Sequence, residues 1–171
     1  MRIASFGLAA LSLAVACRSQ GPREIGATDA SAASPVTTAR VRVVEAPASG
    51  DVQPIVRDAV AAARAPAGHP DAVLLVYVGA TWCEPCQRFH RAAARGDLDA
   101  TFPGLTLLEF DLDRDRERLA AAGYTSKLIP LFALPAADGA ASGKQVEGGI
   151  KGDGAVAFIV PRLKGLLGPG S

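Results

Sequence analysis

The stretch VLLVYVGATWCEPC, residues 73–86, decides the fold of this chain. Residues 73–78 form a continuous apolar run rich in β-forming side chains, which predicts a strand buried on both faces. Residues 83 and 86 are cysteines in a Cys-x-x-Cys spacing, and a helix predicted to begin at this pair lasts to about Arg95. The sequence therefore places two thiols where a buried strand passes into a helix.

Strand and helix patterns alternate on both sides of this stretch. Their hydrophobic spacing predicts further strands at 39–45, 105–112, 131–134 and 145–148, and further helices at 51–63, 114–122 and 152–167. The resulting order, βαβαβαββα, predicts one α/β domain over residues 39–168.

Individual turn and cap residues support these boundaries. Asp51 and Asp153 are the expected N-caps of two helices. A loop containing Asp138-Gly139 and Gly143 is the expected hairpin connection. Pro161 conflicts with the last helix, because an interior proline removes a backbone hydrogen bond.

Composition excludes several classes of protein. Hydrophobic residues make up 49% of the 171 positions and charged residues 20%, which argues against collagen-like, coiled-coil and charge-rich disordered chains. A net charge of +1 gives no electrostatic reason to expect nucleic-acid binding. Three cysteines are too few for a disulfide scaffold, so we expect Cys17 to have a different role from Cys83 and Cys86.

The N-terminus has the pattern of a targeting segment. Residues 3–16 carry no charge and follow Arg2, and this run is too short to span a bilayer but suits a signal peptide. The sequence from Leu13 to Cys17 resembles the lipobox of bacterial lipoproteins. We therefore expect residues 1–16 to be a signal peptide and Cys17 to be lipidated, with a soluble periplasmic protein as the alternative.

Residues 17–38 are rich in Ser, Ala, Thr, Gly and Pro and lack hydrophobic periodicity, which predicts a flexible tether. Together with the lipidated cysteine, this predicts a periplasm-facing domain anchored to a bacterial membrane. Such a location permits disulfide chemistry.

Residues 39–168 resemble the thioredoxin family. The resemblance rests on the motif WCEPC at 82–86, on Ile129-Pro130 before the predicted hairpin, and on Gly148-Gly149 near the end of the last strand. It implies a thioredoxin fold, with a central mixed β-sheet flanked by helices and a cis-proline at position 130. It also implies a thiol:disulfide oxidoreductase that needs no cofactor.

The two cysteines have different expected roles. Cys83 stands at the helix start, where unpaired backbone N–H groups and the helix dipole favour its thiolate, so it is the expected nucleophile. Cys86 faces the same side three residues later and is the expected resolving thiol. Trp82, Ile129 and Pro130 are expected to contact the substrate.

Three neighbours are expected to tune the dithiol. Pro85 fixes the backbone between the sulfur atoms, and the carboxylate of Glu84 would oppose thiolate formation and favour a more reducing couple. Glu84 could equally point away into solvent. Tyr77 stands where thioredoxins often bury an acid that takes a proton from Cys86, and tyrosine is a poor substitute near neutral pH.

Alternatives from other classes remain open. Cys83, Cys86 and His90 share one helical face and could bind copper or zinc, although His69 is the only other histidine and no metal site is expected. A redox-inert interaction module is the third hypothesis. The charged run at 111–118 is interpreted as a strand end followed by an exposed helix.

The expected protein is a monomer that exchanges disulfides with other proteins, more as a reductase than as an oxidase. Its upstream redox partner is not specified by the sequence.

Overall fold

The computed structural model describes residues 39–64 and 72–168. The predicted signal peptide, Cys17, the tether and His69 lie outside these residues. None of the helices that are described is both long and apolar enough to cross a bilayer.

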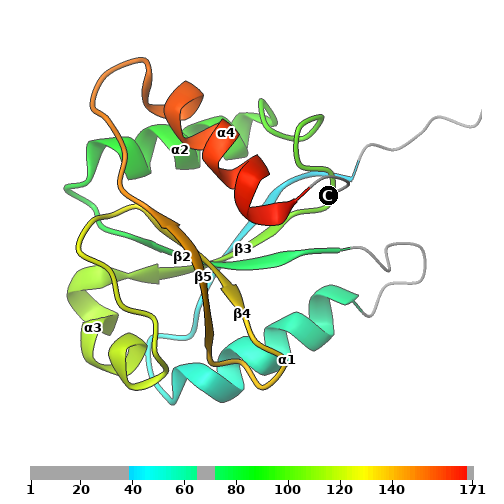
Figure 1. The fold of residues 1–171 in the computed structure, drawn as a ribbon, viewed down its shortest axis with the longest axis vertical. Coiled ribbons are helices and arrows are strands. Elements are labelled where there is room, and N and C mark those ends of the chain that lie inside the picture. The colour runs from blue at the N-terminus through cyan, green and yellow to red at the C-terminus, as the bar shows by residue number, and fades with distance from the viewer. Residues whose placement is uncertain (1–38, 65–71, 169–171) are drawn as a thin grey trace, which may run out of the picture. The chain divides into compact units, whose positions relative to one another are not determined.

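Five strands form one mixed sheet in the order β1-β3-β2-β4-β5 (Figure 1). β1, β3 and β2 run parallel, whereas β4 is antiparallel to β2 and to β5. The elements follow the predicted order βαβαβαββα, and this topology is the thioredoxin fold. Their bounds are β1 Arg42–Glu45, α1 Val52–Arg64, β2 Leu74–Gly79, α2 Glu84–Arg95, β3 Thr106–Asp111, α3 Leu112–Ala121, β4 Leu131–Pro135, β5 Ala141–Glu147 and α4 Ala155–Leu167.

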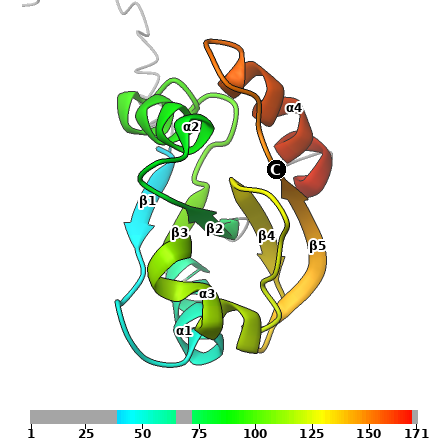
Figure 2. The ribbon, with the colours of Figure 1, turned by 90° about the vertical axis from the view of Figure 1, so that its left-hand side faces the viewer.

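Helices cover both faces of the sheet, with α1 and α3 on one face and α2 and α4 on the other (Figures 1 and 2). The central strand β2 is buried along its whole length, as its continuous apolar sequence predicts. Its side chains alternate between the faces: Leu75 and Tyr77 pack in the core beneath α2 and α4, and Val76 and Val78 pack beneath α1 and α3.

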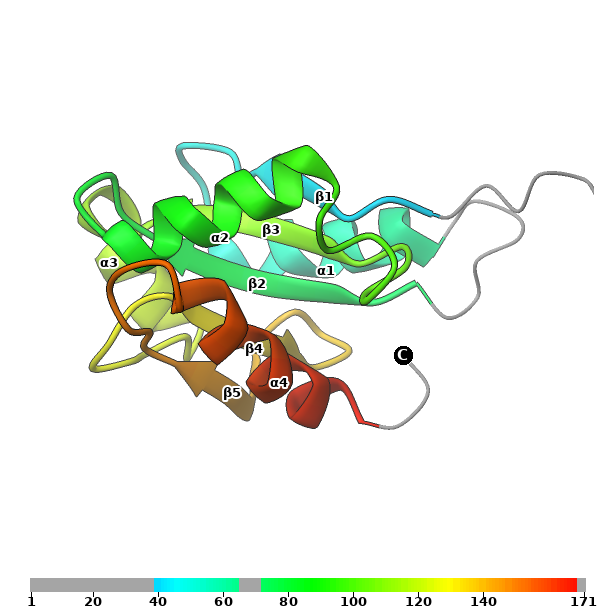
Figure 3. The same ribbon diagram turned by 90° about the horizontal axis from the view of Figure 1, so that it is seen from above.

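The end of β2 leads directly into α2, which places the start of that helix at the carboxyl edge of the parallel strands (Figure 3). Phe89 anchors the helix on the sheet, with its ring centroid 4.8 Å from that of Phe132 in β4. Phe132 in turn stacks on Tyr77 at 5.0 Å. These three buried rings fix the first turns of α2, and with them the cysteine pair, on the sheet.

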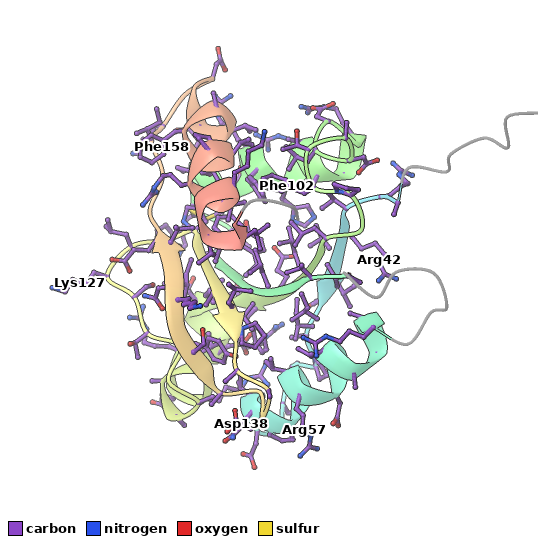
Figure 4. The ribbon with its side chains drawn as sticks, turned by 45° about the vertical axis from the view of Figure 1, so that its right-hand side comes forward. Arg42, Arg57, Phe102, Lys127, Asp138 and Phe158 are labelled. Atoms are coloured by element: carbon purple, nitrogen blue, oxygen red, sulfur yellow. A yellow bond between two sulfur atoms is a disulfide. The ribbon has the colours of Figure 1, made fainter. Side chains whose placement is uncertain are left out.

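The hairpin differs from its prediction. Asp138 and Gly139 do form the turn, which packs against α1 near Arg57 (Figure 4), where Gln53 donates a hydrogen bond of 3.1 Å to Asp138. Gly143, however, lies inside β5 with φ +81°. One residue of β4 there faces three of β5, so the glycine accommodates an irregularity of the strand rather than the loop.

One expectation about the last helix is corrected, and its predicted end at Leu167 is confirmed. Asp153 does not cap α4: the cap residue is Gly154, without a side-chain hydrogen bond, and Asp153 instead accepts one from Arg88. α4 continues through Pro161 to Leu167.

The helix that follows residue 111 was expected to be exposed, but one of its carboxylates is buried. α3 begins at Leu112 with Asp111 as its N-cap, and Asp115 in its first turn is 0% exposed. Asp115 is buried because the guanidinium groups of Arg114 and Arg118 close over it, each with an ion pair of 2.9 Å. The alternating charges of this run therefore form a structural cluster that links α3 to the end of β3.

Candidate active site

Cys83 and Cys86 form a disulfide at the start of α2, with their Cα atoms 5.3 Å apart. Cys83 is the N-cap of the helix and Cys86 lies in its first turn. The backbone N–H of Cys86 donates a hydrogen bond to Cys83 Sγ at 3.3 Å. This N–H and the helix dipole would stabilise a negative charge on Cys83 Sγ once the disulfide is reduced.

Both cysteines are nearly inaccessible, with 4% of Cys83 and 3% of Cys86 exposed. Pro85, buried between them, packs against Gly149 in the segment that joins β5 to α4. A Cβ atom at Gly149 would lie 2.8 Å from Pro85 Cβ and 3.4 Å from Pro130 Cδ. Because position 149 has no side chain, Pro85 and Pro130 can both pack closely against the β5–α4 segment.

Ile129-Pro130 is a cis peptide bond, as the resemblance implied. Pro130 is buried and its carbonyl accepts a hydrogen bond of 2.8 Å from the N–H of Gly148. The backbone N–H and carbonyl of Ile129 have no hydrogen-bond partner among the described residues. The peptide groups of Ile129 therefore remain available next to the disulfide.

The carboxylate of Glu84 is engaged by two neighbours. It accepts a hydrogen bond of 2.8 Å from Arg88 Nε and one of 3.1 Å from the N–H of Gly152, and these bonds lower its pKa. Arg88 also donates to Asp153 at 2.7 Å. The expectation that Glu84 raises the thiol pKa stays a prediction, and the structure adds a paired cation that offsets its charge.

Tyr77 lies beneath the cysteine pair, with 1% of its surface exposed. Its hydroxyl donates a hydrogen bond of 3.2 Å to the carbonyl of Cys86. Burial, and to a lesser extent the negative charge of Glu109, raises its pKa far above the ordinary value. Tyr77 therefore stays protonated and acts as a donor to the backbone of the first helical turn.

Trp82 is not a core residue: 64% of it is exposed, and its indole N–H donates to Asp113 at 2.8 Å. Leu128 and Ile150 are also large and apolar, with 60% and 45% exposed. We call Trp82, Leu128 and Ile150 the apolar rim, because they adjoin in sequence Cys83, the Ile129-Pro130 pair and Gly149. Next to Leu128, Lys127 extends away from the molecule (Figure 4).

A cavity of about 510 Å³ adjoins Cys86. It is lined by Tyr77, Cys86, His90, Glu109 and residues from the ends of the neighbouring strands. His90 Nδ1 lies 3.3 Å from Glu109 Oε1. Sequence reasoning weighed His90 as a metal ligand and as a partly exposed helix residue, and missed Glu109, although a single charged residue in the apolar run 105–110 is a recognisable signal.

The structure brings the copper alternative no support. Within the ranges 39–64 and 72–168, no group of three or more His, Cys, Asp or Glu side chains is arranged to hold a metal ion. His90 is directed to Glu109 instead.

No protein-family model matches the chain, and no curated protein matches it. Solved structures that are similar include a thioredoxin from Trichomonas vaginalis, 19% identical over 74% of this chain and 94% of that chain, with a TM-score of 0.45. A mutant thioredoxin from Halobacterium salinarum is 22% identical over 75% of this chain and 88% of that chain, with a TM-score of 0.39. Thioredoxin O1 from Arabidopsis thaliana, in the oxidized state, is 19% identical over 75% of this chain and 95% of that chain, with a TM-score of 0.39.

These sequence identities and TM-scores are low, so the activity is inferred from features of this chain. The sheet topology, the helix-capping disulfide and the adjacent Pro130 support a thiol:disulfide oxidoreductase in general.

Proposed function

We propose that this protein exchanges disulfides with extracytoplasmic protein substrates through Cys83 and Cys86, and that it acts mainly as a reductase. The observation that carries the proposal is the Cys86 N–H directed at Cys83 Sγ, at a helix N-terminus. A sulfur atom held in this way is the more stable thiolate of the pair, and a thiolate is the species that attacks a disulfide.

In the reducing direction, the Cys83 thiolate attacks one sulfur of a substrate disulfide. A mixed disulfide forms, the substrate S–S bond breaks, and the first substrate thiolate leaves and takes a proton from water. The Cys86 thiolate then attacks Cys83 Sγ and releases the second substrate thiolate. The substrate gains two electrons, the pair becomes a disulfide, and an external dithiol must reduce it again.

Substrate binding is supported by Ile129 and the apolar rim. An extended substrate segment could pair with the unpartnered peptide groups of Ile129, as a short added strand. The exposed side chains of the rim would cover the apolar part of that segment, with Trp82 held in place by Asp113. A protein segment fits this surface better than a compact small molecule does.

The nucleophile is tested by trapping. Cys86→Ser should accumulate mixed disulfides with protein partners, whereas Cys83→Ser should accumulate none and should lose all disulfide reduction. The two variants differ only in which sulfur is missing. Equal trapping by both would contradict the assignment of Cys83.

Whether the protein acts as a reductase or as an oxidase is tested by the reduction potential of the Cys83–Cys86 pair, measured in glutathione buffers. A reductase should lie near the range of thioredoxin, about −270 mV. A value close to that of strong oxidants, about −120 mV, would contradict the reductase role.

The location is supported by sequence alone, through the uncharged run before Cys17. Mass spectrometry of the mature protein should find an acylated cysteine as the N-terminal residue. An unmodified Cys17 within a mature chain would contradict lipid anchoring.

A further inference from the structure

Burial makes it difficult for the Cys86 thiol to lose its proton. If the protein works as proposed above, the Cys86 thiol must lose its proton before it can attack Cys83 Sγ in the mixed disulfide. Only 3% of Cys86 is exposed, so bulk water reaches it poorly. A base inside the protein is therefore needed for fast resolution.

Tyr77 is close to Cys86 but cannot serve as this base. Its hydroxyl proton is held in the hydrogen bond to the Cys86 carbonyl, and burial raises the pKa of the phenol. A protonated phenol has no negative charge with which to take up the thiol proton.

Glu109 and His90 meet Cys86 at the 510 Å³ cavity. Glu109 is paired in register with Tyr77 on the adjacent parallel strand, so both side chains project to the face covered by α2. His90 lies four residues after Cys86 on α2 and therefore faces the same side of the helix. The 3.3 Å contact between His90 Nδ1 and Glu109 Oε1 joins the two at the cavity wall.

The other charged groups that line the cavity already form ion pairs or hydrogen bonds with other residues. Glu45 of β1 pairs with Arg114 of α3 at 3.2 Å, and Arg114 also binds Asp115. Asp111 at the end of β3 uses its carboxylate to cap α3, accepting from the N–H groups of Asp113 and Arg114. Glu109 with His90 is the pair at this cavity that can take up a further proton.

We propose that the Glu109–His90 pair accepts the proton of the Cys86 thiol across this cavity when the mixed disulfide is resolved. The proton passes to the pair, directly or through water, and the cavity is far larger than the roughly 30 Å³ that one water occupies. The Cys86 thiolate forms the bond to Cys83 Sγ, and the bond from that sulfur to the substrate breaks. Both side chains are partly exposed, 46% for His90 and 26% for Glu109, so the pair can return the proton to solvent.

Stopped-flow reaction with an aromatic disulfide that releases coloured thionitrobenzoate separates the two steps. The full chain with Cys17→Ser provides a background in which Cys83 and Cys86 are the only thiols. The first release, by Cys83, depends on reagent concentration, and the second, by Cys86, does not. We expect Glu109→Gln and His90→Gln each to slow the second release about 100-fold at neutral pH and to leave the first unchanged.

The pH profile distinguishes proton transfer from a structural effect. The second release should depend more steeply on pH in Glu109→Gln than in the parent chain, because without the internal base the Cys86 thiol loses its proton only to water or buffer. Glu117→Gln, an exposed carboxylate of α3, is the matched control and should leave both steps and the profile unchanged.

The outcomes separate the two proposals. A parent chain without the first release would overturn the proposed function itself. Two normal releases, with an unchanged second rate in both Glu109→Gln and His90→Gln, would overturn the proton-acceptor role alone. If Glu109→Gln fails to fold, His90→Gln still decides the question, because 46% of the His90 side chain is exposed.

Discussion

Replacing Asp115 by asparagine tests the buried charge cluster of α3. The fully buried carboxylate accepts five hydrogen bonds: two from Arg114, two from Arg118 and one from the backbone N–H of Asp111. An asparagine at this position would keep the shape of the side chain but would lose the charge and one acceptor oxygen. Arg118 would then lose its carboxylate partner, and Arg114 would keep only Glu45.

The expected cost can be worked from the exposure of the partners. Breaking a buried ion pair on one side costs about 3–5 kcal/mol, because it leaves an unpaired charge. Arg114 and Arg118 are 35% and 17% exposed, so water recovers part of this loss. We expect Asp115→Asn to reduce the free energy of unfolding by about 2–4 kcal/mol, a large share of the roughly 5–15 kcal/mol of an ordinary domain.

Urea denaturation followed by circular dichroism measures this loss. Asp58→Asn is the matched control, since Asp58 also pairs with an arginine but is 71% exposed, and its loss should stay below about 1 kcal/mol. A loss for Asp115→Asn no greater than that of the control would refute the reasoning.

The same variant should change the pH dependence of stability. Burial alone would raise the pKa of Asp115, but hydrogen bonds from Arg114, Arg118 and Asp111 together lower it below the ordinary value. A depressed folded-state pKa stabilises the protein above the unfolded-state pKa of about 3.9, and this stabilisation is lost as pH falls through the folded value. The difference between wild type and Asp115→Asn should therefore be constant near neutral pH and shrink below about pH 4.

Two other substitutions test the packing around the cysteines. Tyr77→Phe removes the hydrogen bond to the Cys86 carbonyl and should lower the free energy of unfolding, measured by urea denaturation, by about 1 kcal/mol. The rate of the second thiol release should not change. A large fall in that rate would mean that the phenol transfers the proton. Gly149→Ala places a Cβ 2.8 Å from Pro85 Cβ and should destabilise the domain by about 1–3 kcal/mol. Gly165→Ala, on a helix with open space around it, should instead stabilise by about 0.5–1 kcal/mol; a similar effect of the two substitutions would contradict the close contact at Gly149.

The sequence predicted the fold well because its strongest signals are local. A continuous apolar run such as 73–78 can be satisfied only in a strand covered on both faces, and the cysteine spacing marks the helix that follows. The cis-proline at position 130 followed from the resemblance, and the structure confirms it.

The parts that were not predicted depend on contacts between distant residues. Asp153 has the residue type of an N-cap, but a guanidinium 65 positions away binds its carboxylate instead. Asp115 looks like one charge among many until its neighbours close over it. The role proposed for Glu109 depends on its register opposite Tyr77, which no local pattern specifies.

Two kinds of interaction hold the segments around the dithiol: van der Waals packing of Pro85 and Pro130 on Gly149, and an ion pair nearby. Prolines have no N–H and glycine has no side chain, so this contact is held by van der Waals packing, on which ionic strength has little influence. The adjacent pairing of Glu84 with Arg88 is partly exposed and weakens as salt screens it. Added salt should therefore weaken the link from Glu84 and Arg88 to the start of α4, while the packing of Pro85 and Pro130 on Gly149 stays unchanged.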